Sequence, residues 1–341
     1  MSDEHRLART ELRRTLAGVP DAQPREDLEA AIADSVAYLG SDAALRSIEA
    51  DTYMPKWNSP WWHMLALHEL GEARRIPDRV VTKMVDGLNA LPVKTFPIHP
   101  EDGSGNGRDL CHCAVGSIYQ VLTACGVDVD GALPWMKPWF VRYQMADGGL
   151  NCDETAYLVR GECPSSMVGT IAPFEAMLLG RWSPEQEAFL DRAAGFLVER
   201  KLMLGSPSVH NAVEREAQSR WLAPCFPRFY FYDVLRGLAA FTRWAELSGR
   251  SIPLGAVAGV IEHLVAEFPD GVVRLQREGV ASCPTTRYET RRGVWERGPT
   301  SRFPLLDATS VIGKPCAAST RQWSATRRSL LELVDAGRIV D

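Results

Sequence analysis

Residues 139–170 read WFVRYQMADGGLNCDETAYLVRGECPSSMVGT, and this stretch decides the fold. Its apolar and aromatic residues predict a helix that ends at Gln144. Asp147-Gly148-Gly149 then predicts a tight turn, because glycine adopts positive φ without steric cost. A polar segment with two cysteines and two acids follows, and Ser165-Ser166 predicts the start of a new helix. We expect the same plan of helix, turn and helix along the rest of the chain.

The helices expected from the sequence fall into two alternating kinds. Strongly apolar helices are expected to begin near residues 61, 109, 165, 229 and 319, and amphipathic helices near 77, 133, 184 and 253. A helix that is apolar all round is buried, whereas an amphipathic helix covers a core. The pattern therefore predicts an all-α fold, a ring of helical hairpins with the apolar helices inside and the amphipathic helices outside. A superhelical stack of hairpins is the alternative.

Few strands are expected. The best strand candidate is the short run from Gly271 to Leu275, and residues 272–317 otherwise have the Arg, Pro and Gly content of a loop. We expect residues 1–25 to form a short helix or a frayed leader, and residues 26–341 to form one domain.

Composition narrows the class of protein. The chain has 341 residues and a net charge of −5, which gives no indication of a broad nucleic-acid footprint. No apolar run reaches the ~18 residues of a membrane span, and the charged N-terminus has no apolar signal core. We therefore expect a cytoplasmic protein without a transmembrane segment. In that compartment its eight cysteines are expected to be free thiols or metal ligands.

The turn motif resembles that of a known superfamily. Gln144 to Leu150, Q-x-x-D-G-G-L, resembles the glutamine–tryptophan repeat of squalene–hopene cyclases and the glycine-rich repeat of protein prenyltransferase β-subunits, with Leu150 in place of the usual aromatic residue. Segments 147–152, 165–170 and 226–238 are similar to bacterial proteins of this superfamily. The resemblance covers patches of residues 45–335 and implies an (α/α) toroid, but it implies no specific reaction.

The resemblance supports two hypotheses about function. The first is an enzyme of the terpenoid cyclase or prenyltransferase type, which holds a hydrophobic, isoprenoid-like small molecule in an aromatic-lined central cavity. The second is a non-catalytic binding or scaffold module with the same fold. The chain has D-V-D-G at residues 128–131 instead of the cyclase motif D-x-D-D, and it has no D-D-x-x-D motif. These missing acids favour the second hypothesis. A weaker third possibility is carbohydrate chemistry with two carboxylates ~5–10 Å apart.

A metal site is the most specific chemical expectation. Arg108 to Cys113, R-D-L-C-H-C, resembles the R-D-x-x-H segment that supplies the zinc-binding histidine of protein prenyltransferases. Zinc accepts imidazole, thiolate and carboxylate ligands, and a catalytic site keeps one position open. The D-x-C ligand pair of that family has no clean copy here. The candidate zinc ligands are His112, Cys111, Cys152 and Cys163. Alternatively, Cys111 and Cys113 are core residues and His112 makes one hydrogen bond.

Further candidates come from polar groups near cysteines or within apolar helices. Asp153 and Glu154 follow Cys152 and could act as general acid and base, although adjacent acids are more often solvated. Asp233 and Arg236 are three residues apart and are expected to pair on one helix face. The candidate catalytic residues are Asp109, His112, Asp153, Tyr230 and Asp233. The candidate substrate-binding residues are Trp61, Trp62, His63, Tyr232 and Arg236. Each of these has a structural alternative, as a buried core residue, a helix cap, a solvated loop acid or a member of a structural ion pair.

Overall fold

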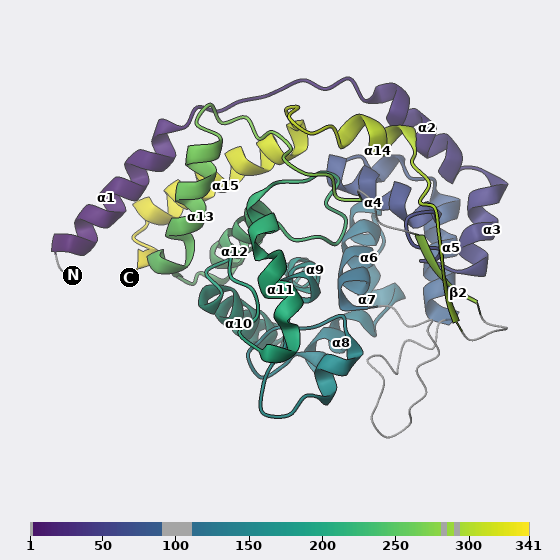
Figure 1. Ribbon diagram of the computed structural model, residues 1–341, viewed down its shortest axis with the longest axis horizontal. Coiled ribbons are helices and arrows are strands. Elements are labelled where there is room, and N and C mark those ends of the chain that lie inside the picture. The colour runs from purple at the N-terminus through teal and green to yellow at the C-terminus, as the bar shows by residue number, and fades with distance from the viewer. Residues whose placement is uncertain (1–2, 91–110, 281–284, 290–293, 341) are drawn as a thin grey trace.

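A computed structural model describes residues 3–90, 111–280, 285–289 and 294–340, and these are mostly helical (Figure 1). The α-helices are α1 (Asp3–Gly18), α2 (Glu29–Leu39), α3 (Asp42–Ala50), α4 (Pro60–Leu70), α5 (Asp78–Ala90), α6 (His112–Cys125), α7 (Val129–Ala132), α8 (Met136–Tyr143), α9 (Met167–Met177), α10 (Pro184–Glu199), α11 (Ala212–Ala217), α12 (Val234–Ser248), α13 (Leu254–Glu267), α14 (Pro304–Thr309) and α15 (Ala317–Asp335). Short 3-10 helices are η1 (Ala73–Arg75), η3 (Glu154–Leu158), η4 (Val209–Asn211) and η5 (Gln218–Leu222). The strands are β1 (Ile252–Pro253), β2 (Thr285–Glu289), β3 (Val294–Gly298) and β4 (Ile339–Val340). The expected all-α class is confirmed.

Five helices pack in sequence at the centre of the molecule. Helix α4 contacts α6, α6 contacts α9, α9 contacts α12 and α12 contacts α15. Most residues of α4, α6 and α9 are buried, as their continuous apolar sequences predict. The α6–α9 contact is the closest of these, because a Cβ added at Gly116 would lie 2.4 Å from the carbonyl carbon of Ala172. Glycine at this position therefore lets the two helices touch backbone to backbone.

The amphipathic helices α8, α10 and α13 bury one face against these five, whereas α5 packs on α3. Helix α10 contacts α8, α9, α12 and α13, and it begins with a capping box formed by Ser183 and Gln186. The N-terminal helix α1 lies beside α13 and α15 (Figure 1), and its Leu12 and Leu16 are buried. Residues 3–18 are therefore helical and packed on the body of the protein.

The turn quoted first connects α8 to the segment before α9. Gly148 has φ +89°, and a Cβ there would lie 2.1 Å from the carbonyl oxygen of Arg192. Gln144 donates from Nε2 to the carbonyl oxygens of Gly148 and Phe189 at 2.8 and 2.9 Å. Asp147 accepts hydrogen bonds from the Gly149 amide and the Ser165 hydroxyl. The Gln, Asp and Gly residues of this motif thus have structural roles.

Several local expectations differ from the structure. Helix α12 begins at Val234, not near residue 229, because Asp233 accepts a hydrogen bond from the Arg236 amide and caps the helix. Residues 272–317 contain the antiparallel pair β2–β3 and helix α14. The expected strand at 271–275 forms an isolated bridge from Arg274 to Pro315 and further backbone hydrogen bonds to residues 313–316. Helix α3, at residues 42–50, was not expected. Pro173 lies inside α9.

Candidate metal centre

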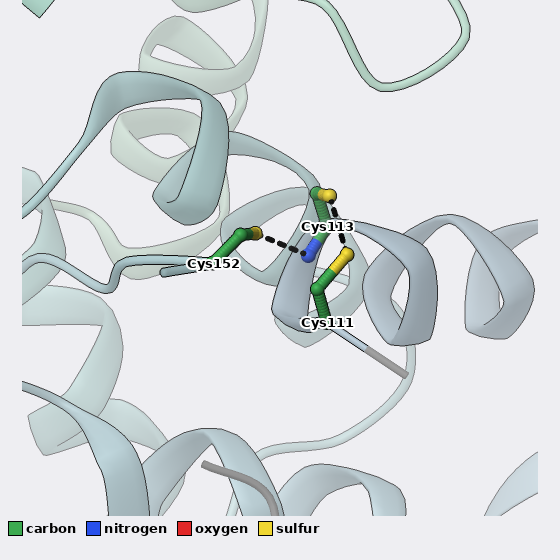
Figure 2. Close-up of side chains that lie close together, drawn as sticks. All are labelled: Cys111, Cys113 and Cys152. Carbon is green, nitrogen blue, oxygen red and sulfur yellow. Dashed lines mark hydrogen bonds between the residues drawn. The ribbon is translucent and has the colours of Figure 1, made fainter. Parts of the chain in front are cut away.

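Three cysteines meet at the start of α6. Cys111 is the N-cap residue of α6, Cys113 lies in its first turn, and Cys152 comes from the segment that follows the 147–149 turn (Figure 2). Their sulfur atoms all lie within 4.8 Å of one another. Cys111 Sγ is 3.1 Å from Cys113 Sγ, and the Cys113 amide lies 3.4 Å from Cys152 Sγ. Residues 39 positions apart in the sequence thus form one thiol cluster.

Backbone pairing positions the Cys152 segment. Leu150 forms an isolated antiparallel bridge with Ser166, and its amide donates to Thr170 Oγ1 at 2.9 Å. Ser166 and Thr170 belong to the first turns of α9, which packs closely on α6. Because α9 carries the bridge, the close α6–α9 contact also delivers Cys152 to the start of α6.

A buried hydrogen-bond chain joins the same two segments. Trp139 Nε1 donates to His112 Nδ1 at 2.8 Å, and His112 Nε2 lies 2.8 Å from the Tyr157 hydroxyl. Because the indole N–H can only donate, Nδ1 is the acceptor and Nε2 carries the proton. The Asn151 amide also donates to the Tyr157 hydroxyl, at 3.1 Å. His112 and Tyr157 therefore connect the first turn of α6 to the residue before Cys152.

His112 differs from its expected role. Both of its ring nitrogens are used by Trp139 and Tyr157, and burial lowers the pKa of its imidazole to about 3. Neighbours on a helix diverge by about 100°, so His112 and the two flanking cysteines point in different directions. The described residues thus place Cys113 in the cluster where His112 was expected. Cys163, also an expected ligand, is a half-buried free cysteine outside this group.

The cluster has the dimensions of a thiolate metal site. Zinc binds cysteine sulfur at ~2.3 Å, so two sulfurs on one tetrahedral ion lie about 3.8 Å apart. The observed sulfur separations bracket this value, from 3.1 Å to at most 4.8 Å. Cys113 is buried, whereas Cys111 and Cys152 are partly exposed, so a ligand has access from outside. The residues present therefore fit a thiophilic ion with three protein ligands.

The thiols share negative charge unevenly. Hydrogen bonds from Cys113 and Cys152 hold the pKa of Cys111 well below its usual value. The same interactions, seen from the donor side, raise the pKa of Cys113 and Cys152. Lys56 adds a positive charge that also lowers the pKa of Cys111. A cation at the cluster would remove this competition, because it stabilises all three thiolates together.

Aromatic rings surround Lys56 beside the cluster. The Lys56 ammonium lies 4.7 Å from the Tyr230 ring centroid and 5.4 Å from that of Trp57. Tyr53 is buried, and the nearby cysteines and Tyr230 contribute to raising its pKa, although burial is the larger cause. Tyr230, an expected catalytic residue, thus lies against Lys56, whose charge reaches Cys111.

The other expected catalytic acids have structural contacts. Asp153 caps η3 by accepting from the Thr155 amide at 2.9 Å. Asp233 caps α12, so the expected side-chain pair with Arg236 is not formed; Arg236 binds Glu175 instead, at 2.6 Å. Asp109 lies outside the described residues.

The expected substrate-binding residues lie mainly in the core. Trp61 and Trp62 are buried, and the Tyr232 hydroxyl donates to the Leu202 carbonyl at 2.7 Å. His63 stacks on Phe303, with ring centroids 3.9 Å apart. An apolar sequence does not reveal which side of a fully buried helix meets a cavity.

A central cavity contains the polar residues that sequence reasoning missed. Its lining includes Arg236, which was expected to bind substrate, together with His68, Glu69, Glu175 and Arg228. The available signal was an ionisable side chain inside a continuous apolar helix, as in the His68-Glu69 pair of α4 and Glu175 of α9.

Comparison with protein-family models, with curated proteins and with solved structures finds no match to this chain. The described helices include none with the length and apolar content that crossing a membrane requires.

Proposed function

We propose that the protein is a metal-dependent enzyme with an (α/α) toroid fold, whose zinc ion is bound by Cys111, Cys113 and Cys152. The observation that carries this proposal is the convergence of three sulfur atoms within 4.8 Å from two separate segments. Three protein ligands leave one position open, which is the arrangement of catalytic rather than structural zinc. When bound, zinc would lower the pKa of a water or substrate thiol at that position.

The helix packing supports the toroid. All five central helices, α4, α6, α9, α12 and α15, contribute residues to one cavity, and each contacts the next in the sequence. The last and first of these helices are linked as well, because Arg321 of α15 donates to the Leu70 carbonyl at the end of α4. The amphipathic helices α8, α10 and α13 pack around them, as a ring of hairpins requires.

The chain's own residues have clear parts in this proposal. His112 and Tyr157 orient the two ligand segments, and Lys56 offers a positive charge beside the thiolates. Tyr230 supplies an aromatic face against Lys56, suited to a hydrophobic substrate. An isoprenoid-like substrate would bind at this aromatic surface rather than in the central cavity. The cavity is too polar for it, because two acidic groups, Glu69 and Glu175, and two basic groups, Arg228 and Arg236, line its wall.

Metal analysis tests the proposal. Protein purified under reducing conditions should contain one zinc per chain, and cobalt substitution should give the intense thiolate charge-transfer bands of a tetrahedral site. Cys113→Ser and Cys152→Ser should each lose most of the metal, whereas the matched control Cys163→Ser should keep it. Metal-free wild-type protein that also fails to bind added zinc or cobalt would refute the metal centre.

The 3.1 Å contact between Cys111 and Cys113 supports one competing function, a redox-active dithiol. A dithiol would form a reversible disulfide with a mass loss of two hydrogens and would need no metal. A scaffold module would show neither stoichiometric metal nor reversible oxidation. The same purified protein therefore separates the three possibilities.

A further inference from the structure

The central cavity is a polar chamber at the middle of the helix ring. It has a volume of about 200 Å³. Two carboxylates, Glu69 and Glu175, and two guanidinium groups, Arg228 and Arg236, line it, together with His68 and Ser117. At ~30 Å³ per molecule, this volume corresponds to about seven waters, which is smaller than a drug-sized pocket.

Most charges in this chamber are already neutralised. Arg236 binds Glu175 through Nε and Nη2 at 2.9 and 2.6 Å, and its Nη1 donates to the carbonyl oxygens of Phe229 and Phe231. Glu69 accepts from the backbone amide of Arg228 at 2.8 Å. These contacts hold the wall of the cavity in place, and they pair each of these charges with a protein group rather than leaving it for a ligand.

Two hydrogen-bonding groups in the wall remain unsatisfied. Among the described residues, the Ser117 hydroxyl and Arg228 Nε make no hydrogen bond, although both atoms are shielded from bulk solvent; Arg228 Nε has only the 3.6 Å ion-pair contact with Glu69 Oε2. Ser117 is only 2% exposed. A buried donor without a partner is costly, and such groups in native proteins normally meet a water or a ligand. Both of these groups can donate to an oxygen atom placed in the chamber.

The charge balance argues against an anion. The four charged lining groups sum to zero when ionised, and Asp233 adds a further acid 3.7 Å from Arg228. Burial lowers the pKa of His68 to about 4, so its imidazole is neutral at pH 7. An anionic ligand would therefore enter a site without net positive charge, and it would lose its hydration on entry.

We infer that the cavity binds a neutral, polyhydroxylated molecule of about five carbons, such as a pentose or pentitol. Its oxygens accept from Ser117 and Arg228, and its hydroxyls donate to the acceptor oxygens of the chamber. This site is separate from the thiol cluster and does not depend on a metal there, although Cys113 precedes Ser117 by one turn of α6.

Calorimetric titration of the full chain, as purified, tests this inference with three sets of probes. These are the aldopentoses and pentitols, the pentonates of matching stereochemistry, and isoprenol, which has five carbons and one oxygen. At least one neutral pentose or pentitol should bind with 1:1 stoichiometry. It should bind at least about tenfold more tightly than its pentonate, because desolvating a carboxylate is costly in a neutral site.

A pair of serine variants locates the binding. Ser117→Ala should weaken binding about three- to tenfold, the effect of one hydrogen bond. Ser324→Ala is the matched control, since Ser324 is also buried with an unsatisfied hydroxyl but lines a different groove, next to Asp21. Its affinity should equal that of the wild type.

Three results would overturn the inference. If a pentonate or isoprenol bound as tightly as the best neutral pentose or pentitol, the proposed class of ligand would be wrong. Equal losses in the two serine variants would place the binding elsewhere. Absence of binding by all aldopentoses and pentitols would mean that the chamber holds only water.

Discussion

The N-terminal ends of α6 and α12 bear polar groups on otherwise buried helices, but they differ in how those groups are satisfied. At α12, Asp233 caps the helix and Arg236 has a partner for each of its nitrogen atoms. At α6, three thiols face one another, and the Lys56 charge is among the groups that lower the pKa of Cys111. A complete set of opposite partners indicates a structural role, whereas a cluster of like ligands indicates a binding site for a cation.

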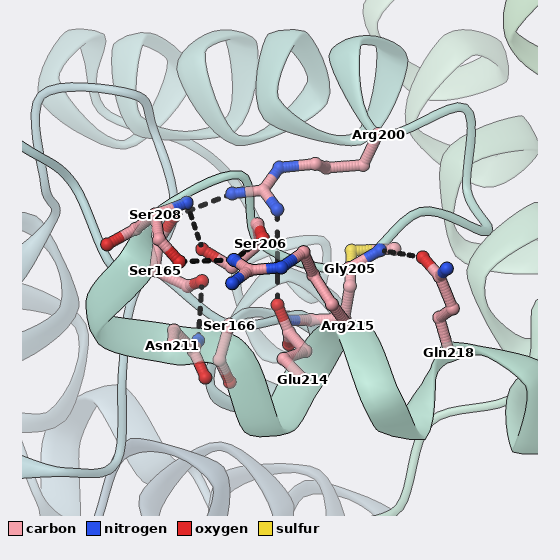
Figure 3. A network of polar contacts seen from close by, with 12 residues as sticks. Ser165, Ser166, Arg200, Gly205, Ser206, Ser208, Asn211, Glu214, Arg215 and Gln218 are labelled. Atoms are coloured by element: carbon pink, nitrogen blue, oxygen red, sulfur yellow. Dashed lines mark hydrogen bonds and ion pairs between the residues drawn. The ribbon is translucent and has the colours of Figure 1, made fainter.

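Helix α9 begins in a third way, between these two. Figure 3 shows Arg200, Glu214 and several serines gathered where α11 meets the segment before α9. Glu214 accepts from the Met167 amide and so caps α9, but its Oε2 is 4.0 Å from Arg200 Nη1, and neither of these atoms has a hydrogen-bond partner among the described residues. This start is therefore structural but only partly neutralised.

The largest expected effect comes from breaking the ion pair of α12. Glu175→Leu leaves the buried Arg236 guanidinium without its carboxylate, so we expect a loss of about 3–5 kcal/mol in the free energy of unfolding. Urea unfolding monitored by circular dichroism measures it.

A surface pair on the same helix provides the control. Arg243 and Glu246 lie 3.5 Å apart, and Arg243 is 60% exposed. Glu246→Leu should change stability by less than about 1 kcal/mol. If the two variants were equally stable, a full set of hydrogen-bond and ion-pair partners would not identify a structural charge in this protein.

The next effect concerns α9 and depends on pH. Burial raises the pKa of Glu214 from 4.5 to about 7. Because the folded-state pKa is the higher one, the stabilisation is full below pH ~4.5 and is lost as pH rises through about 7. The shift corresponds to at most about 3 kcal/mol between these limits.

Glu214→Gln removes this titration and keeps an oxygen that can accept from the Met167 amide. We therefore expect the variant to gain stability relative to the wild type between pH 5 and pH 8, as measured by urea unfolding at each pH. A difference between the two proteins that stays constant over this range would contradict the raised pKa.

Sequence patterns predicted the helices better than the directions of their side chains. The apolar runs of α4, α6 and α9 gave helix positions to within a few residues, because a continuous apolar run is a local property of the sequence. The prediction started α12 too early, near residue 229, because Phe229 to Tyr232 are aromatic; in the structure these residues precede the Asp233 cap.

The candidate site was predicted in part for the same reason. The sequence prediction brought Cys111 and Cys152 together, but it included His112 where the structure has Cys113. The rotation of α6, which decides this, is set by its contact with α9. Glu175 and Arg236, 61 residues apart, form a pair that no local pattern reveals.

The smallest expected effect distinguishes a cap from a catalytic acid at α12. Asp233→Asn keeps a side-chain oxygen for the Arg236 amide, and asparagine caps helices about as well as aspartate. We expect less than about 1 kcal/mol of lost stability, mainly from the 3.7 Å contact with Arg228, and unchanged metal content. Asp233→Ala removes the cap and should cost about 1 kcal/mol more. If the asparagine variant kept its stability but lost metal, Asp233 would instead contribute to the proposed metal site at the start of α6.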